Sequence, residues 1–330
     1  MNKSFRRFLS LILAVFMVLS CAVFSSAEGE AADGEATAPV FKYGDITEDE
    51  KVNSSDALAA LKHSVGINLL EGEAFRAADV NGDSSVNSSD ALEILKYSVG
   101  SIKFFPIEVA VEKPETAAEI LALYANTINE ARKTIPAYKL KSTSKGLKVS
   151  FSGTAMSFVP KEEIETMKKD MLKESSFQNI FRAGSSTAFA NLPGECKVTD
   201  PSLLKEVKLT ELADGNYQID IAFKDDKNPK ANSPIVTMLN VPDKDTFIKQ
   251  MNDELGSAVG GEDISASAEL KNLEYTNCRI SCVIDVKTGD FVSVNTEYDM
   301  RTNMTTYVAF FSMGTDTTTK TVNEYSNFIY

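Results

Sequence analysis

The chain has 330 residues, a length typical of two domains, and it carries 34 Lys and Arg against 47 Asp and Glu. The formal net charge of −13 argues against nucleic acid as a partner, because an acidic surface repels phosphate. The one histidine is His63, which excludes Ser-His-Asp, Cys-His and HExxH sites from the C-terminal half.

The N-terminal segment has the pattern of a secretory signal peptide. Basic residues precede a nearly continuous apolar run over residues 8–24, which is short for a membrane span of roughly 20 apolar residues. Ser25-Ser26-Ala27 fits a small-residue cleavage site, so we expect cleavage after Ala27, a linker over residues 28–40 and secretion of the rest. A lipid anchor at Cys21 is the alternative, which the bulky Leu19 disfavours.

A thirteen-residue phrase then occurs twice, 34 positions apart. Residues 54–66 read SSDALAALKHSVG, and residues 88–100 read SSDALEILKYSVG. Each copy follows an oxygen-rich loop, which begins at Asp45 in the first copy and at Asp79 in the second. The duplication indicates one structural unit used twice, each time a loop that leads into an amphipathic helix.

The two loops match an EF-hand-type calcium loop, which takes ligands at positions 1, 3, 5, 7, 9 and 12. Oxygen ligands at this spacing suit Ca²⁺, and we expect two ions. Two Asx-rich turns that cap helices are the alternative, but they do not explain an apolar position 8 and an acidic position 12 in both copies. The expected ligands are Asp45, Thr47, Asp49, the Lys51 carbonyl, Asn53 and Asp56 in loop 1, and Asp79, Asn81, Asp83, the Ser85 carbonyl, Asn87 and Asp90 in loop 2.

Some loop positions depart from the usual pattern. Position 6, normally Gly, is Glu50 and Ser84, so we expect left-handed backbone there at a cost of roughly 1–2 kcal/mol each. Thr47 stands where an amide or carboxylate is usual, so loop 1 should bind calcium more weakly than loop 2. Val52 and Val86 at position 8 are expected to pair as a short strand.

The motif D-x-[NT]-x-D-x-x-V-N-S-S-D-A-L, present twice, resembles the dockerin module of cellulosomal proteins over about residues 41–106. The L-K-x-S-V-G ending is similar to the ruminococcal style of that family. The resemblance implies a small helical fold with two calcium ions, an extracellular, cellulosome-associated protein, and binding to a cohesin domain of a scaffold protein. It also implies that loop positions 10 and 11, joined by residues farther along each helix, face the cohesin; the matching residues are Ser54, Ser55, Lys62, His63, Ser88, Ser89, Lys96 and Tyr97.

Helical spacing predicts the core of this module. A module this small buries little apolar surface, so bound metal should supply much of its stability. We expect Phe75 and Ala78 in a short helix before loop 2, and His63 in solvent on the partner face. The expected core residues are Leu58, Leu61, Val65, Leu92, Leu95 and Val99, with Phe41 and Tyr43 packed on Phe104, Phe105 and Pro106 to close the two ends.

Residues 107–115 are expected to form a linker, and residues 116–330 an α+β domain with an antiparallel sheet. Helices are predicted from the Thr116–Glu119 capping box, after Pro160, and over residues 247–255 with an end at Gly260-Gly261. Alternating apolar residues predict strands at 147–151, 217–223, 280–286, 292–294 and within 305–330, with turns at 224–227 and 287–290.

The sequence of this second domain favours a non-catalytic role. Cys196, Cys278 and Cys282 remain after signal cleavage; burial as free thiols is favoured, and a pairing of Cys196 stays open. Two carboxylates suffice for glycoside hydrolysis, so a plant-polysaccharide-degrading enzyme is the first alternative, although the chain has no Trp on which sugars could stack. A lipid or ligand carrier is the second, because the helix-first, sheet-rich layout is loosely similar to lipoprotein carriers of the LolA and LppX type.

Overall fold

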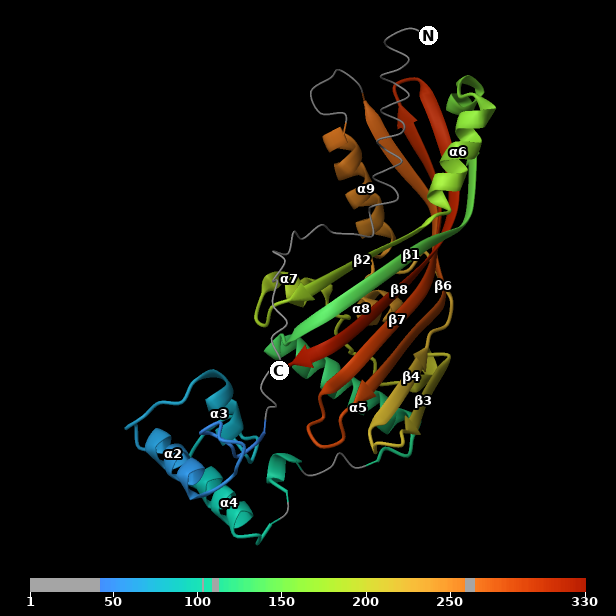
Figure 1. The fold of residues 1–330 in the computed structure, drawn as a ribbon. Coiled ribbons are helices and arrows are strands. Elements are labelled where there is room, and N and C mark those ends of the chain that lie inside the picture. The colour runs from blue at the N-terminus through green and yellow to red at the C-terminus, as the bar shows by residue number, and fades with distance from the viewer. Residues whose placement is uncertain (1–41, 103, 109–112, 259–264) are drawn as a thin grey trace. The chain divides into compact units, whose positions relative to one another are not determined.

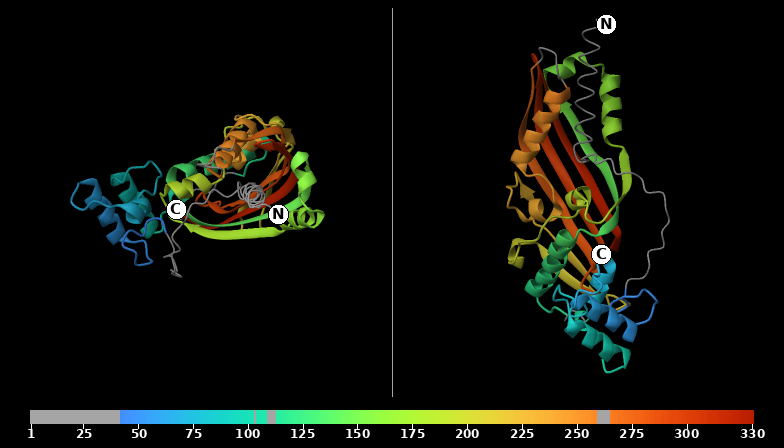
Figure 2. Two further views of the ribbon diagram at one scale, coloured as in Figure 1. Left: turned by 90° about the horizontal axis from the view of Figure 1, so that it is seen from above. Right: turned by 90° about the vertical axis from the view of Figure 1, so that its left-hand side faces the viewer.

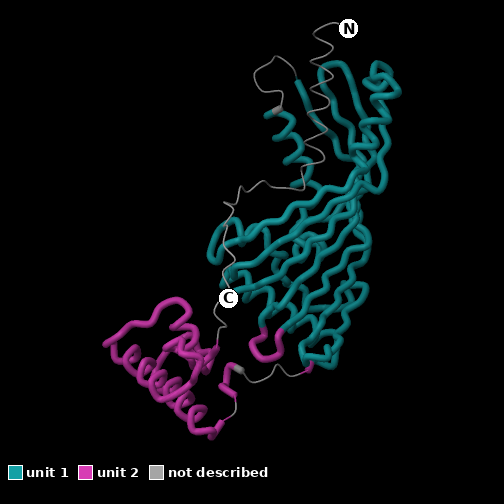
Figure 3. Tube along the Cα trace, viewed as in Figure 1, with its two compact units in different colours: residues 1–32, 114–284, 290–330 teal, residues 33–113, 285–289 magenta. Residues whose placement is uncertain are grey.

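The computed structural model describes residues 42–102, 104–108, 113–258 and 265–330. The expected signal peptide, the linker over residues 28–40, Phe41 and Gly260-Gly261 lie outside these ranges. The chain divides into two compact units, one of residues 33–113 with 285–289 and one of the remainder (Figure 3). We call residues 42–113 the helical unit and residues 114–330 the sheet unit, and describe the 285–289 turn with the strands that it joins.

Three α-helices make up the helical unit: α2 (Ser54–Ser64), α3 (Gly72–Ala78) and α4 (Ser88–Ser98), followed by the 3₁₀ turn η1 (Pro106–Glu108) (Figure 1). The two repeat helices begin in the same way. Asn53 caps α2 and Asn87 caps α4, and in each a capping box is completed by the aspartate three residues later. The repeated sequence therefore gives two helices with the same start, and they pack against each other.

The core of the helical unit differs from the one that the sequence predicts. Ala60 and Ile94 have no exposed surface, and Ala57 and Ala91 are only 2% exposed, so these residues form the contact between α2 and α4. The six predicted core residues are exposed instead, at 51% for Leu58, 38% for Leu61, 66% for Val65, 52% for Leu92, 38% for Leu95 and 74% for Val99. The prediction was wrong because the short alanine side chains let the two helices approach closely on the alanine side. The leucines and valines on the other side of each helix, here called the leucine ridge, therefore face outward.

Aromatic side chains close the two ends of the helical unit, largely as expected. Tyr43 and the fully buried Phe105 belong to the same core, and Tyr97 stacks on Phe105 with ring centroids 4.6 Å apart. Phe104 is 60% exposed and takes no such part. Gly44 has a φ of +82°, and a Cβ there would lie 2.5 Å from the Phe105 ring, so only glycine fits this approach.

The sheet unit contains an eight-stranded antiparallel sheet in the order β2-β1-β8-β7-β6-β4-β3, with β5 paired to β6. The antiparallel sheet confirms the predicted class of this domain. The strands are β1 (Ala137–Ser152), β2 (Glu174–Phe181), β3 (Glu206–Glu211), β4 (Tyr217–Ala222), β5 (Asp226–Lys227), β6 (Ala266–Ile284), β7 (Phe291–Val308) and β8 (Phe311–Ile329).

Helices accompany the strands of the sheet unit, and the capping box predicted at Thr116 starts the first of them. No helix in the described ranges is long and apolar enough to cross a membrane. The helices are α5 (Ala117–Thr134), η2 (Thr154–Phe158), α6 (Lys161–Met171), α7 (Ser186–Asn191), η3 (Pro201–Leu203), α8 (Pro234–Leu239) and α9 (Lys244–Ala258).

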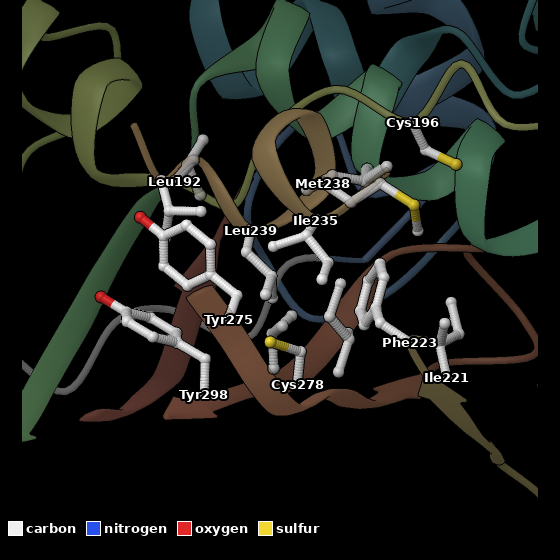
Figure 4. Close-up of a cluster of buried hydrophobic side chains, with 14 of the residues drawn as sticks. Leu192, Cys196, Ile221, Phe223, Ile235, Met238, Leu239, Tyr275, Cys278 and Tyr298 are labelled. Atoms are coloured by element: carbon white, nitrogen blue, oxygen red, sulfur yellow. The ribbon is translucent and has the colours of Figure 1, made fainter. Parts of the chain in front are cut away.

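The curved sheet packs one face against α5, α8 and α9 (Figure 2). Figure 4 shows part of this core, in which Ile235, Met238 and Leu239 of α8 lie over Phe223 and Cys278 from the sheet side. A second, smaller cluster joins α6 and η2 to the far ends of β1 and β8. Alternating burial along β4, β6 and β7 places the apolar residues of these strands on the face that packs against the helices.

Two local predictions for the sheet unit need correction. Leu147 does not share a face with Val149 and Phe151, because a register shift between Gly146 and Lys148 leaves it 48% exposed. The segment predicted as a turn at 224–227 contributes the two-residue strand β5 instead.

All three cysteines of the sheet unit are free and buried, which confirms the favoured prediction and excludes a disulfide of Cys196 with either of the others. Burial raises the pKa of the Cys278 thiol to about 12 and raises that of the Cys282 thiol further. The pKa of the Cys196 thiol is also raised by burial. The thiols are therefore neutral core side chains at neutral pH.

The two edges of the sheet differ in character. β3 exposes charged side chains, among them Glu206, Lys208 and Glu211, which discourage pairing with another strand. β2 has no charged residue over 175–181, and the N–H of Ile180 donates to the side-chain oxygen of Asn179 at 2.9 Å. One edge is thus protected by charge and the other by a local hydrogen bond.

Candidate functional site

Loop 2 is organised around the carboxylate of Asp79. Its two oxygens accept hydrogen bonds from the backbone N–H groups of Gly82 at 2.9 Å, Asp83 at 3.1 Å and Ser84 at 2.9 Å. These bonds hold the backbone of residues 82–84 around the side chain of the first loop residue. These are Asx-type turns, in which a side-chain oxygen accepts hydrogen bonds from backbone N–H groups a few residues farther along the chain.

The same type of bond continues along both loops. In loop 2 Asn81 accepts from the N–H of Asp83 at 2.8 Å, and in loop 1 Asp49 accepts from the N–H of Lys51 at 2.9 Å. Asp45 accepts from the N–H of Asp49 at 3.1 Å, although loop 1 has fewer of these bonds than loop 2. The difference agrees with the less regular sequence of loop 1.

The aspartate at position 12 closes each loop. Asp56 is fully buried and accepts from the N–H groups of Ile46 at 2.9 Å, Thr47 at 3.0 Å and Asn53 at 2.8 Å, and also from the Thr47 hydroxyl at 2.9 Å. The carboxylate of Asp56 therefore links the start of loop 1, at Ile46 and Thr47, to its later part at Asn53. A carboxylate that is buried in this way is stable only when it is fully hydrogen-bonded or paired with a cation.

Asp90 occupies the same place in loop 2. It is fully buried and accepts from the N–H of Asn81 at 3.3 Å and of Asn87 at 2.9 Å. Burial raises the pKa of the Asp90 carboxyl, the nearby charge of Asp79 raises it further, and the backbone hydrogen bonds offset part of this shift. The electrostatics of loop 2 thus favour positive charge near these two carboxylates.

Left-handed backbone recurs at equivalent positions of the two loops. Position 6 has φ = +64° at Glu50 and +65° at Ser84, which confirms the sequence prediction, and position 4 has φ = +57° at Glu48 and +75° at Gly82. At the non-glycine residues this conformation costs roughly 1–2 kcal/mol each. Val52 and Val86 do not form the predicted strand; both pack in the core of the unit.

The predicted ligand residues are compatible with calcium in their chemistry. Every predicted ligand in the two loops is an oxygen donor, and each loop brings three carboxylates. Within the described ranges no group of three or more His, Cys, Asp or Glu lies close enough to hold a metal ion, since Asp56 and Asp90 turn toward backbone N–H groups. Carboxylates at positions 1, 5 and 12 would have to turn toward one centre to bind a cation.

The predicted partner residues lie in different environments. The serines at loop positions 10 and 11 are exposed in both copies, and Lys62 is exposed as well. Lys96 pairs with Glu93 at 2.7 Å, and Tyr97 is half-buried against Phe105. His63 is not simply solvated, because its Nδ1 accepts from the N–H of Leu70 at 2.8 Å and its ring packs edge-on against Phe75.

The sequence analysis missed an exposed apolar face on each repeat helix. A serine, two leucines and a valine follow one another at spacings i, i+4, i+7 and i+11, which places them on one side of a helix. The signal was present in the alanines at i+3 and i+6 from Ser54, whose small size marks the buried side. We call these two sets the outer stripes; they are Ser54, Leu58, Leu61 and Val65 on α2, and Ser88, Leu92, Leu95 and Val99 on α4.

Comparison with known proteins gives a name to the helical unit only. Residues 43–97 match the family model described as the dockerin type I domain. A solved chain from Acetivibrio cellulolyticus, in a structure described as the third cohesin of ScaC in complex with the ScaB dockerin, is 33% identical, covers 21% of this chain and 96% of that chain, and has a TM-score of 0.20. No curated protein matches the chain. On the strength of the family match, residues 43–97 of this chain are a dockerin segment.

Proposed function

We propose that the dockerin segment attaches this chain to a cohesin domain through the outer stripes of α2 and α4. The single observation that carries the proposal is the family match at residues 43–97, because cohesin binding is the function of dockerins. The outer stripes supply a surface suited to this role. Apolar side chains that stay exposed at regular spacing, next to hydroxyls and a lysine, are typical of a protein-binding face.

The apolar part of each stripe offers substantial binding energy. Leu58 and Leu61 are 51% and 38% exposed, so a partner could still bury about half of each side chain. Full burial of a leucine contributes roughly 1.5–3 kcal/mol, so each of these residues could contribute about 1 kcal/mol. The serine hydroxyl at the head of the stripe adds a hydrogen bond of roughly 0.5–1.5 kcal/mol.

The two stripes are nearly equivalent, which favours binding in two orientations. The exposed fractions agree between copies, at 51% for Leu58 against 52% for Leu92 and 38% for both Leu61 and Leu95. Exchange of the two helices would present almost the same face to a cohesin. The copies differ beside the stripes, notably where His63 in α2 corresponds to Tyr97 in α4, so the two orientations need not be equally strong.

We further propose that the two loops bind one calcium ion each and that the ions stabilise the dockerin segment. What supports this is the oxygen-only set of predicted ligands, the matching left-handed positions and the buried position-12 aspartates, together with the family match. The carboxylates that would hold the ions are Asp45, Asp49 and Asp56 in loop 1 and Asp79, Asp83 and Asp90 in loop 2. Cations at these loops would relieve the repulsion among carboxylates.

The rest of the chain is proposed to be an exported, non-catalytic module that the dockerin segment carries into a cellulosome. The proposed boundaries are a signal peptide over residues 1–27, linkers over 28–40 and 107–115, the dockerin over 41–106 and the module over 116–330. A secretory pattern at the N-terminus and the family match support this assignment.

The test is calorimetric titration of the full chain with a panel of cohesin domains, with calcium and with excess chelator. We expect binding in calcium and none in chelator. Leu58→Asp and Leu92→Asp should each leave substantial binding, and the double variant should lose it. Leu69→Asp is the matched control, because Leu69 is 68% exposed in the same unit but lies outside the stripes.

Each arm of this experiment has an outcome that overturns part of the proposal. Normal binding by the double variant would show that the outer stripes are not the contact face. Loss of binding in either single variant would show that one orientation is used. Full binding in chelator would remove the calcium requirement.

A further inference from the structure

A pocket of about 170 Å³ lies on the helix-facing side of the sheet unit. Strands β1, β2, β7 and β8 form its sheet wall, and residues 190–192 and 239–241, at the ends of α7 and α8, form the opposite wall. Three of its residues, Leu192, Leu239 and Tyr298, are labelled in Figure 4 at one end of the buried core. The pocket is independent of the dockerin segment and of its proposed partner.

The volume of the pocket matches one small ring. An apolar cavity of roughly 150 Å³ in a protein core accommodates a benzene molecule, so this pocket holds about one six-membered ring, whose substituents would extend toward the exposed Asn240 at its rim. A long acyl chain would need several times this volume. Size alone therefore selects a compact cyclic ligand, or one ring at the end of a longer molecule.

The lining carries no charged side chain. Its two tyrosines stay protonated at neutral pH, because burial raises the pKa of Tyr298 to about 12 and that of Tyr325 still higher. A charged ligand would find no counter-ion there and would lose its hydration without compensation. The pocket thus favours a neutral ligand.

Polar side chains in the lining are held in fixed positions. The Asn323 carbonyl oxygen accepts from the Ser142 hydroxyl at 2.6 Å, and its amide nitrogen donates to the Thr296 hydroxyl at 3.1 Å. This chain of bonds crosses three neighbouring strands, β1, β8 and β7, on the face that lines the pocket. A wall of amide and hydroxyl groups fixed in this way is preorganised for hydrogen bonding to a ligand.

The opposite wall offers acceptors. Asn240 uses its amide nitrogen to donate to the carbonyls of Ala190 at 2.8 Å and Leu192 at 3.1 Å, and Asn191 uses its own to donate to the carbonyl of Thr187 at 2.9 Å. The side-chain oxygens of both asparagines accept no hydrogen bond from another described residue. Both amides line the pocket with their nitrogens already anchored, so their oxygens remain as the acceptors that a ligand with several hydroxyl donors could use.

We propose that this pocket binds one neutral sugar ring, either a free monosaccharide or a terminal residue of an oligosaccharide. Amide oxygens would accept from its hydroxyls, and the rings of Phe177, Tyr298 and Tyr325 would contact its C–H surface. An apolar ligand of the same size would bury the asparagine oxygens without partners. The lining holds no carboxylate, so the pocket binds sugar without hydrolysing it.

The test uses a fluorescent reporter in the full chain. The chain has no Trp, so Phe177→Trp, at a residue that is 36% exposed, creates a unique fluorophore at the pocket. We expect glucose, xylose or cellobiose to shift its emission with saturation, whereas glucuronate and laurate do not. Saturable binding of a neutral sugar supports the proposal; binding of glucuronate or laurate alone, or of none of the five compounds, overturns it.

Variants in the reporter background separate the pocket from the rest of the surface. Asn191→Leu removes an amide of the lining without a large change in volume and should weaken sugar binding by roughly three- to tenfold, whereas Tyr298→Phe keeps the ring that contacts the sugar and should weaken binding less. Tyr307→Phe is the matched control, since Tyr307 is 38% exposed and pairs with Glu269. Equal affinities in all three variants would overturn the assignment, provided that circular dichroism shows each to be folded.

Discussion

Replacement of Ile94 by Ala should destabilise the dockerin segment far more than replacement of Leu92, two residues earlier on the same helix. Ile94 has no exposed surface and contributes to the α2–α4 contact, whereas Leu92 is 52% exposed. Truncation of Ile94 removes three carbon groups from the core, about 2.4 kcal/mol at roughly 0.8 kcal/mol for each, and adds a cavity term. A total of about 3 kcal/mol is a large fraction of the stability of so small a unit.

Native-state hydrogen exchange of the full chain in calcium, followed by mass spectrometry of peptides from α2 and α4, measures this difference locally. A loss of about 3 kcal/mol should accelerate the slowest amides roughly 150-fold in Ile94→Ala. Ile94→Val, expected to cost about 1 kcal/mol, should fall between that variant and the parent. Leu92→Ala should accelerate exchange by about tenfold at most, because about half of its surface is already in water and the expected loss is about 1.2 kcal/mol.

The reasoning would be refuted if Leu92→Ala accelerated exchange as much as Ile94→Ala. Such a result would mean that the leucine ridge, rather than the alanine side, is buried between the helices. The opposite pattern is expected for cohesin binding. Leu58→Ala combined with Leu92→Ala should weaken binding, because the outer stripes are proposed to contact the partner, and should accelerate exchange less than Ile94→Ala does alone.

Further predictions concern the loops, a glycine and a thiol. Asp79→Ala should lower calcium affinity more than Asp45→Ala, because Asp79 binds three backbone N–H groups and Asp45 binds one; calorimetric titration giving the reverse order would contradict this. Gly44→Ala should destabilise the helical unit by more than about 2 kcal/mol in thermal unfolding, because the new Cβ would meet the Phe105 ring at a residue whose φ is positive. Gly66 also has a positive φ but no neighbour within 4 Å, so Gly66→Ala should cost only the backbone strain, roughly 1–2 kcal/mol. The buried Cys278 thiol should contribute its full share of the stability of the sheet unit below the pKa of an exposed thiol, and this share should be lost as the pH rises toward about 12, the raised pKa of Cys278. Urea midpoints measured against pH should show the decline, which should be less steep in Cys278→Ala than in the parent.

The repeat allowed the dockerin segment to be identified from the sequence, but helical spacing alone did not predict which residues form its core. The capping asparagines and aspartates have local roles, so the helix starts that they fix, such as the one at Asn53 and Asp56, depend on neighbouring residues alone. The buried side of α2 depends on the partner helix, which the sequence of α2 does not contain. The spacing of the leucines is compatible with burial of either face of the helix. Only the small size of Ala57 and Ala60 indicates that their face is the buried one.

In the sheet unit, long alternating segments predicted strands and a capping box predicted α5, because both signals are local. The pocket could not be predicted, since it joins Ser142, Asn191 and Asn323 from distant parts of the chain. Asn240 adopts φ = +56° after α8, which orients its side chain toward α7, and a lone asparagine in sequence gives no sign of this. The packing of the ends of α7 and α8 against β1 and β8, and not residue type alone, brings these side chains together.

The edge at β2, uncharged over residues 175–181, has a consequence wherever several copies of this chain are brought close together. An edge strand with unpaired backbone groups is a template to which strands of neighbouring molecules can add, the first step toward insoluble fibrils. β3 prevents this with charge, but β2 relies on the Asn179 side chain, which occupies the N–H of Ile180. Removal of that amide would leave one more donor open to an incoming strand.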